Sequence, residues 1–277
     1  MIAFASNSLL CRAALKETSI DAASFTSIRI FSGAAALWII LKMRRSTSSL
    51  AGDWISAFAL FAYAAAFSFA YNTLSAGTGA LLLFGAVQAT MISWGYCKGE
   101  RLRAIQIAGL LVAVIGLVVL VFPGLSAPPL IGSVLMLSAG LAWGVYSLRG
   151  KAVGDAIAAT AGNFLYAVPF AALMSVLMVP QMHLDSLGAT YAIISGAITS
   201  GLGYVIWYAA LPDLKAASAA TVQLSVPVIA ATGGILLLAE PITLRYAIAS
   251  LAVLGGIFLV IIERRPASQN PAPTVTD

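Results

Sequence analysis

The sequence contains few charged residues. Only 9% of its 277 residues are Asp, Glu, Lys or Arg, whereas soluble domains carry about 25%. Hydrophobic residues make up 61% of the chain, and a water-soluble protein of this composition could not form the polar surface that it needs. The low charge therefore excludes an ordinary soluble domain and indicates an integral membrane protein.

Cysteine and histidine are also scarce. Cys11 and Cys97 are too few for a disulfide framework, and we expect both to be free thiols. The single histidine, His183, lies in a predicted loop, so no cluster of Cys and His predicts a metal site. We expect neither a metal nor a cofactor.

Acidic residues are absent from the middle of every apolar segment. Proton-coupled transporters rely on an intramembrane carboxylate or histidine, so we predict facilitated movement of a solute without a carboxylate proton site. The same absence argues against multidrug antiporters that use a membrane glutamate. Because no Ser/His or paired-carboxylate constellation occurs either, we do not expect an enzyme.

Long uncharged runs dominate the sequence instead. No charged residue occurs in 54–97, 104–148 or 246–262, and a helix needs about 20 apolar residues to cross the hydrocarbon. We therefore predict an all-α membrane protein with ten transmembrane helices. Their expected ranges are 1–15, 22–41, 54–73, 76–97, 104–122, 129–148, 157–179, 187–210, 214–238 and 243–262.

The first of these segments could instead be a signal peptide. However, Arg12 and Lys16 follow its apolar run and no basic residue precedes it, which is the wrong pattern for a leader. We expect a first helix whose start lies before, or is trimmed from, the residues given.

The basic residues orient the helices. The net charge of +5 comes from residues between apolar segments, where they determine topology rather than bind nucleic acid. If the N-terminus is cytoplasmic, the outer loops hold only Arg12, Lys16 and Arg245. The positive-inside rule then places both termini in the cytoplasm, and we predict a multi-pass protein of the inner membrane. Residues 264–277 are expected to form a disordered cytoplasmic tail.

The two halves of the chain form an internal repeat. Loop-edge residues coincide when the halves are aligned: Arg12 with Arg149, Tyr71 with Tyr208, and Glu100 with Glu240. Five helices per half is an odd number, so the second half enters the membrane from the other side. We predict inverted five-helix repeats over 1–124 and 128–263 around a central cavity, a common basis for alternating access.

Three segments of the second half carry a family resemblance. They are YVIWYAAL at 204–211, AASAATVQLSVPV at 216–228 and LLAEP at 237–241. They resemble the EamA-type domain of the drug/metabolite transporter superfamily, and the first half is similar to a more degenerate copy that lacks the proline supplied by Pro227. The resemblance covers nearly the whole chain. Within the family the sequence is most similar to aromatic amino-acid exporters of the YddG type, which implies export of such solutes.

Aromatic residues are spaced to share helix faces. Tyr63, Phe67 and Tyr71 follow an i, i+4 pattern. Tyr204 and Tyr208 do the same in the second half, with Trp207 beside them. The repeat pairs the two faces, so we predict walls of a largely uncharged, aromatic cavity that stacks on the solute. For Tyr71 and Tyr208 an interfacial aromatic belt is an equal alternative. Further candidates for lining the cavity are Trp94, Trp143 and Tyr146.

Polar residues inside the predicted spans need partners. The amides Asn7, Gln88, Asn163 and Gln223 either line the cavity, where they could bind a zwitterion, or bond between helices. Arg29 could pair with a substrate carboxylate. We favour a structural role in which it extends to the headgroups, because it lies about 10–12 Å from the start of its span.

Small residues and prolines predict how helices pack and bend. Gly140 and Gly144 allow close approach of a neighbouring helix. Pro169 and Pro227 lie inside predicted helices, where each could act as a hinge or as a static kink.

Together these features favour an exporter of aromatic or hydrophobic amino acids and related metabolites. The alternatives are a permease for another small solute, such as a drug-like amine or a sugar derivative, and a non-transporting membrane scaffold. The expected partners are a small-molecule substrate and membrane lipid, with no nucleic acid. We expect a monomer or a weak homo-oligomer.

Overall fold

The computed structural model describes residues 1–44, 51–99, 102–124, 127–150, 155–210 and 222–262, without the side chains of residues 156, 208 and 209. No strand occurs in these residues. The expected tail over 264–277 lies outside them. The helices are α1 (Ile2–Glu17), α2 (Ala22–Met43), α3 (Trp54–Tyr71), α4 (Ala76–Cys97), α5 (Ala104–Val121), α6 (Leu130–Gly150), α7 (Ala156–Leu177), the 3-10 turn η1 (Val179–Gln181), α8 (Ser186–Ile194), the π-helix η2 (Ser195–Leu202), α9 (Gly203–Ala210), α11 (Ser225–Leu238) and α12 (Leu244–Ile262).

Eight of these helical runs are long and apolar enough to cross a membrane. They are α2 to α7, the continuous run from α8 through η2 into α9, and α12. α1 has 16 residues and the described part of α11 has 14, so both are shorter. The multi-pass membrane fold is confirmed, whereas the count of ten spans remains a prediction.

The outermost helices expose apolar side chains. On α5, Leu111, Ile115 and Val118 are more than half exposed, and Leu251 of α12 is 77% exposed. A soluble protein does not leave so large an apolar surface open to water. The surface is that of a protein solvated by lipid.

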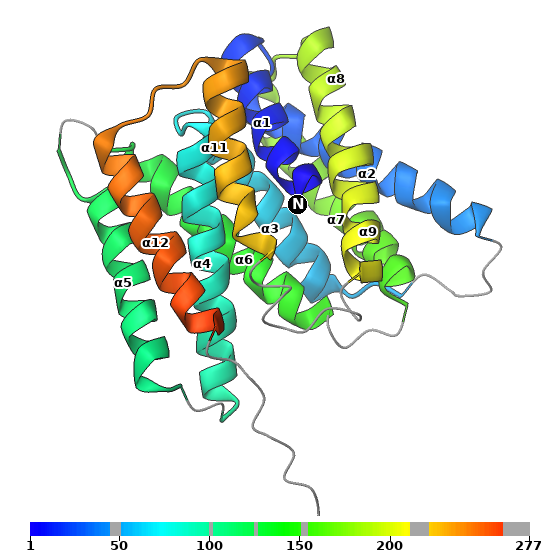
Figure 1. Cartoon of the computed structure of the whole chain (residues 1–277). Coiled ribbons are helices and arrows are strands. Elements are labelled where there is room, and N and C mark those ends of the chain that lie inside the picture. The colour runs from blue at the N-terminus through cyan, green and yellow to red at the C-terminus, as the bar shows by residue number, and fades with distance from the viewer. Residues whose placement is uncertain (45–50, 100–101, 125–126, 151–154, 211–221, 263–277) are drawn as a thin grey trace, which may run out of the picture.

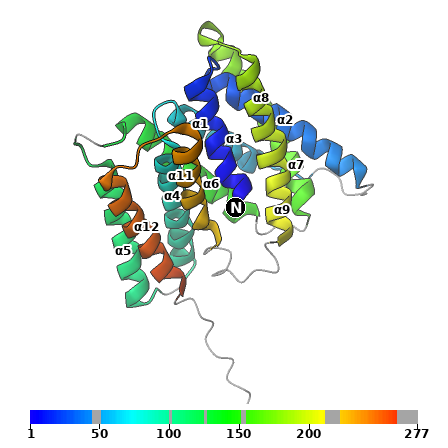
Figure 2. The same cartoon turned by 45° about the horizontal axis from the view of Figure 1, so that its top comes forward.

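The helices pack in pairs that join the two halves of the chain. α5 lies against α12 at one side of the molecule and α2 lies against α7 at the other, with α1, α3, α4, α6 and α11 between them (Figures 1 and 2). At the α5–α12 contact a Cβ on Gly109 would stand 2.5 Å from the carbonyl oxygen of Gly256. Glycine at both positions therefore lets the two helices touch along their backbones.

Other contacts occur in matching sets. α3 packs on α6 as η2 packs on α1, and α4 packs on α6 as α11 packs on α1. The predicted repeat pairs α1 with α6, α2 with α7, α3 with the run α8–η2–α9, α4 with α11, and α5 with α12. Under this pairing, each contact corresponds to its counterpart in the other half. This is the pattern that the predicted two-fold repeat requires, although the inverted orientation of the halves remains a prediction.

Close packing and a helix break occur at the residues singled out in the sequence. A Cβ on Gly140 would lie 2.5 Å from the Cβ of Ala86, and one on Gly144 would lie 2.8 Å from the Cβ of Thr90, so both glycines face α4. Pro169 is inside α7. The helical run before α11 is interrupted at Leu224, three residues before Pro227, because proline removes a backbone donor and clashes with the preceding turn.

Aspartates begin several helices. Asp21, Asp53, Asp155 and Asp185 are the N-cap residues of α2, α3, α7 and α8, and each accepts hydrogen bonds from the backbone of the first turn. These bonds satisfy donors that the helix itself leaves free. Asp21 also binds the N–H of His183 at 2.9 Å, which ties the loop after α7 to the start of α2.

Acid should weaken this cap. Burial opposes ionisation of Asp21, but hydrogen bonds from Ser24, His183 and Ala23 outweigh it and lower its pKa. A lowered folded pKa gives stability that is present above the unfolded value of about 3.9 and is lost as the pH falls through the folded pKa. We expect Asp21→Ala to cost about 1 kcal/mol at pH 7. In thermal unfolding of the detergent-solubilised protein, the difference in unfolding temperature between Asp21→Ala and the wild type should narrow between pH 5 and pH 3. A difference that stays constant over this range would contradict this account.

Candidate functional site

A cluster of aromatic rings fills the centre of the bundle. Trp143 on α6 lies 4.8 Å from the ring of Tyr63, 4.9 Å from Tyr204 and 6.1 Å from Phe4, measured between ring centroids. These rings line a cavity of about 10 Å³, which is room for one water at most. Its lining residues are Phe4, Asn7, Tyr63, Phe67, Leu83, Phe84, Trp143 and Tyr204.

One face of α3 supplies a row of these rings. Tyr63 and Phe67 are 5.4 Å apart and Phe67 and Tyr71 are 4.7 Å apart, as their i, i+4 spacing predicts. All three side chains are buried. Tyr71 is therefore not part of an interfacial belt; its hydroxyl donates to the carbonyl of Ala76 at 3.3 Å. Phe67 and Tyr204, which the repeat pairs, line the same cavity.

A hydrogen-bond network borders the rings on one side. Asn7 of α1 donates to the hydroxyl of Tyr63 at 3.4 Å. Its carbonyl oxygen accepts from Ser195 and, at 3.2 Å, from Thr199. Asn7 is 2% exposed, so these bonds offset the cost of placing an amide in an apolar core.

Arg29 joins this network, which the sequence interpretation did not expect. We predicted that it extends to the headgroups, and this is wrong: Arg29 is 2% exposed. Its Nε donates to Ser200 at 3.2 Å and its Nη2 donates to the hydroxyl of Tyr63 at 3.1 Å. The guanidinium carbon lies 5.2 Å from the ring centre of Tyr63 and 5.0 Å from that of Phe67. The residues that line the cavity are uncharged, and Arg29 lies behind two of them, Tyr63 and Phe67.

The π-helix η2 aims its polar side chains at α1 and α2. Ser195, Thr199 and Ser200 of η2 are buried; Ser195 and Thr199 bind Asn7 of α1, and Ser200 binds Arg29 of α2. α2 can approach because a Cβ on Gly196 would collide with the carbonyl oxygen of Arg29. Such π segments are rare in proteins, and those that occur often lie at functional sites. Hydropathy treats the segment as part of one continuous apolar span, because it does not distinguish π from α hydrogen bonding.

Two predicted site residues lie away from the cavity. Trp94 is 51% exposed near the end of α4, where the ammonium of Lys98 lies 5.1 Å from its ring; this surrounding is typical of an interfacial tryptophan. Asn163 is buried, but its side-chain oxygen accepts from the backbone N–H of Asp53 at 3.0 Å, so it fixes the start of α3. The helical period placed both on plausible faces without revealing which neighbour covers them.

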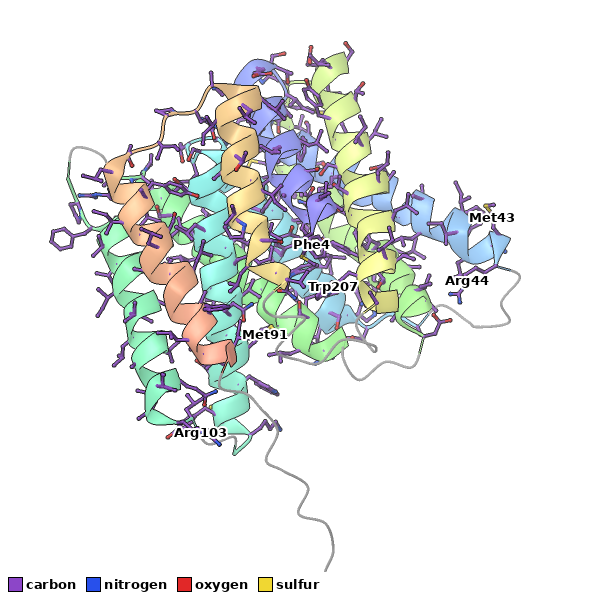
Figure 3. The ribbon with its side chains drawn as sticks, in the orientation of Figure 1. Phe4, Met43, Arg44, Met91, Arg103 and Trp207 are labelled. Atoms are coloured by element: carbon purple, nitrogen blue, oxygen red, sulfur yellow. The ribbon has the colours of Figure 1, made fainter. Side chains whose placement is uncertain are left out.

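The remaining predicted residues lie around the cluster. Tyr146 is 2% exposed and its ring centre is 5.4 Å from that of Trp143. Gln88 is buried one turn beyond Phe84 on α4. Trp207 meets Phe4 edge-on at 6.0 Å between α1 and α9 (Figure 3). The side chain of Tyr208 lies outside the described residues, as does Glu100.

An ion pair closes one end of the bundle. Arg12 of α1 binds the carboxylate of Glu240 at 2.9 Å and the carbonyl of Tyr71 at 2.8 Å. The other oxygen of Glu240 accepts from the N–H of Ala76 at 2.8 Å. The two charged side chains are only 15% and 7% exposed. These contacts join four segments of the chain: α1, the end of α3, the start of α4 and Glu240 just after α11.

A larger groove lies beyond this ion pair. It has a volume of about 190 Å³, and Glu240, Gly77 and Tyr246 are among its lining residues. Tyr71 stands between the groove and the cavity, because its ring touches Phe67 on one side and its hydroxyl reaches Ala76 on the other. Tyr71 and the Arg12–Glu240 pair therefore separate the two spaces.

The chain is similar to several known proteins. Residues 130–262 match the model of the EamA-like transporter family. A protein of Pseudomonas aeruginosa, described as "Uncharacterized protein PA1977", is 57% identical over 95% of this chain and 92% of its own length. An "Uncharacterized transporter" of Archaeoglobus fulgidus is 26% identical over 95% of both chains.

More distant similarities point the same way. The "Uncharacterized transporter YoaV" of Bacillus subtilis is 22% identical over 85% of both chains. A solved structure titled "Crystal structure of protein" superposes with a TM-score of 0.66 over 96% of this chain and 98% of its own, at 18% identity. That likeness shows a shared fold.

Proposed function

We propose that this chain, which belongs to the EamA-like transporter family, exports aromatic or hydrophobic amino acids. Membership of this family points to a transporter of small solutes rather than an enzyme. The export proceeds by alternating access between two inverted halves, 1–124 and 128–263, in the inner membrane with both termini in the cytoplasm. The protein acts as a monomer or a weak homo-oligomer.

The observation that carries this proposal is the aromatic cavity. Its walls come from both halves: Phe4, Tyr63 and Phe67 from the first, Trp143 and Tyr204 from the second. Ring faces and edges bind flat apolar groups through area and quadrupole. The neighbouring amide and hydroxyls can bind the polar end of an amino acid, because a buried site must supply partners for buried polar groups.

The small volume of the cavity supports alternating access. Sites for small molecules enclose about 300–1,000 Å³, whereas this one holds about 10 Å³. A solute can enter only if the halves separate at one end. The buried Arg12–Glu240 pair closes one end, while the matching Arg149 binds Asp53 at 2.9 Å through side chains that are 40% and 48% exposed. The end held by Arg149 and Asp53 is therefore held more weakly, and it opens first.

The proposal includes movement without a carboxylate proton site. Among the described residues, no Asp or Glu lines the cavity, and Glu240 is held by Arg12 at the end of the bundle. We expect flux in proteoliposomes to follow the solute gradient alone. Flux that is strictly driven by a pH gradient and lost in Glu100→Gln or Glu240→Gln would contradict this part of the proposal.

Replacing a wall residue should weaken transport selectively. We expect Phe67→Ala and Tyr204→Ala to lower counterflow of phenylalanine and tryptophan by about tenfold, because each removes one stacking surface. The measurement is uptake of labelled amino acid into proteoliposomes loaded with the unlabelled one. Phe31→Ala and Tyr96→Ala are matched controls, since these rings are 47% and 65% exposed, and both should keep normal flux.

The same assay separates the alternatives. No flux of any amino acid by a folded wild-type protein removes the proposal. Flux of aromatic amines or sugar derivatives in place of amino acids supports a permease for another solute. Absence of flux for every solute supports a non-transporting scaffold.

A further inference from the structure

Arg29 has more hydrogen-bond donors than the protein satisfies. A guanidinium carries five N–H donors. Nε binds Ser200 and one Nη2 hydrogen binds the hydroxyl of Tyr63, while Nη1 is fully buried and has no partner. An unmet donor on a buried charge is expensive, so the pattern needs an explanation beyond packing.

The positive charge of Arg29 is also unmatched. The buried Arg12 pairs with Glu240, and the exposed Arg149 pairs with Asp53. Across the described ranges, no carboxylate lies in ion-pair contact with Arg29. The rings of Tyr63 and Phe67 offset part of the cost through cation–π contact. An unpaired ionisable group inside a membrane protein indicates a functional site.

The unmet donors gather at one side of the aromatic cavity. Arg29 lies against Tyr63 and Phe67, which line the cavity. The hydroxyl of Tyr204, another lining residue, is also buried without a partner. The Tyr63 hydroxyl oxygen accepts from both Arg29 and Asn7, which leaves its own proton to be donated. What fits beside these groups is an acceptor with negative charge.

We propose that Arg29 binds the carboxylate of the transported solute, whose apolar part lies against Trp143 and Tyr204. This inference rests on the proposed transport function and narrows its substrates to amphipathic monocarboxylates. One guanidinium matches one carboxylate in charge and in its paired oxygens. Ligands with a ring and no carboxylate leave Arg29 unpaired and bind less well.

The position of Arg29 allows access after a small change. Its guanidinium carbon lies 5.2 Å from the ring centre of Tyr63 and 5.0 Å from that of Phe67, and both side chains line the cavity. When the halves separate and the cavity widens, rotation of these rings exposes Nη1 to the solute. In the closed conformation, the same rings pack against the buried charge.

Binding can be tested without transport. The probes are 3-phenylpropionate, which has the ring and the carboxylate, and phenethylamine, which has the ring and an amine. We expect 3-phenylpropionate at about 100 times its Kd to raise the unfolding temperature of the full chain in detergent by about 5 °C, and phenethylamine to have no such effect. Arg29→Gln should weaken 3-phenylpropionate binding by about tenfold or more, the loss of a charge-assisted contact.

Two further variants keep the test decisive. Arg29→Lys retains the charge without the planar fork and should bind 3-phenylpropionate with intermediate affinity; it also serves if Arg29→Gln does not fold. Arg245→Gln is the matched control, because it removes a cation at the bundle end that binds the carbonyl of Phe122, and it should bind like wild type.

The outcomes separate this inference from the proposed function. Stabilisation by 3-phenylpropionate that depends on Arg29, without flux of any amino acid, keeps the carboxylate site and removes the transport proposal. Amino-acid flux with unchanged preference for 3-phenylpropionate over phenethylamine in Arg29→Gln removes the carboxylate site and keeps transport. Equal stabilisation of the wild type by both probes also overturns the inference.

Discussion

Trp143→Ala should abolish most transport of aromatic solutes. Its indole touches the rings of Phe4, Tyr63, Tyr146 and Tyr204. Removing it therefore takes a packing partner from rings of both halves of the chain. We expect counterflow to fall by more than about tenfold, because a stacking surface is lost and its neighbours lose their own packing. Stability should also fall, by about 3–5 kcal/mol, since the side chain is 6% exposed.

The loss of binding must be separated from the loss of stability. Trp38→Ala is the matched control, because Trp38 is 49% exposed on α2 and its removal should change neither flux nor stability by much. Trp143→Phe keeps a ring in the cavity and should recover part of the flux. If Trp143→Ala transports normally while remaining folded, the cavity is not the solute site.

Breaking the Arg12–Glu240 pair should open the end of the bundle that it closes. Glu240→Gln leaves Arg12 without its carboxylate and removes the charge that holds the N–H of Ala76. Separating a buried ion pair costs about 3 kcal/mol or more, and this cost falls on the closed state alone. The population with that end open should therefore rise by at least about tenfold.

Cys11 can report this opening. It is next to Arg12, and its thiol is 0% exposed, so it reacts only when the bundle opens. In a Cys97→Ser background, which removes the exposed thiol, Glu240→Gln should speed labelling of Cys11 by a membrane-impermeant maleimide by about tenfold. Equal labelling rates with and without Glu240 would show that the pair does not hold the end closed.

The exposed pair in the other half gives the comparison. Asp53→Asn keeps the helix cap of α3 but removes the charge that binds Arg149. Exposed ion pairs contribute about 0–1 kcal/mol, so this variant should label and unfold nearly as the wild type does. A large increase in labelling or a large loss of stability in Asp53→Asn would contradict the proposal that the Arg149–Asp53 end is the more weakly held one.

Hydropathy was sufficient to place the helices. Uncharged runs of sufficient length can only be helices in lipid, because every backbone group must be satisfied within the segment. Each of the ten predicted ranges holds a helical element among the described residues. The face of α3 formed by Tyr63, Phe67 and Tyr71 also followed from the sequence, since residues four apart on a helix are neighbours.

The partners of single polar residues did not follow from the sequence. Arg29 lies near the start of α2, where an exposed arginine would reach the headgroups, but α2 packs on η2 and α3 and the side chain turns inward. Trp94 and Trp143 both precede a glycine in an apolar segment, yet Trp94 is 51% exposed and Trp143 is 6% exposed. Periodicity gives the face of a helix, and only the neighbouring helices decide whether that face meets lipid or protein.

The scarcity of charge thus determined that the chain is a multi-pass helical membrane protein, because so apolar a sequence is soluble only in lipid. It also indicated that each remaining charge must have a function or a partner. Only the tertiary structure decided which: Glu240 received Arg12 from a helix more than two hundred residues away in sequence, and Arg29, beside an aromatic cavity, meets no carboxylate among the described residues. Such pairings depend on how helices from the two halves meet, which local sequence does not encode.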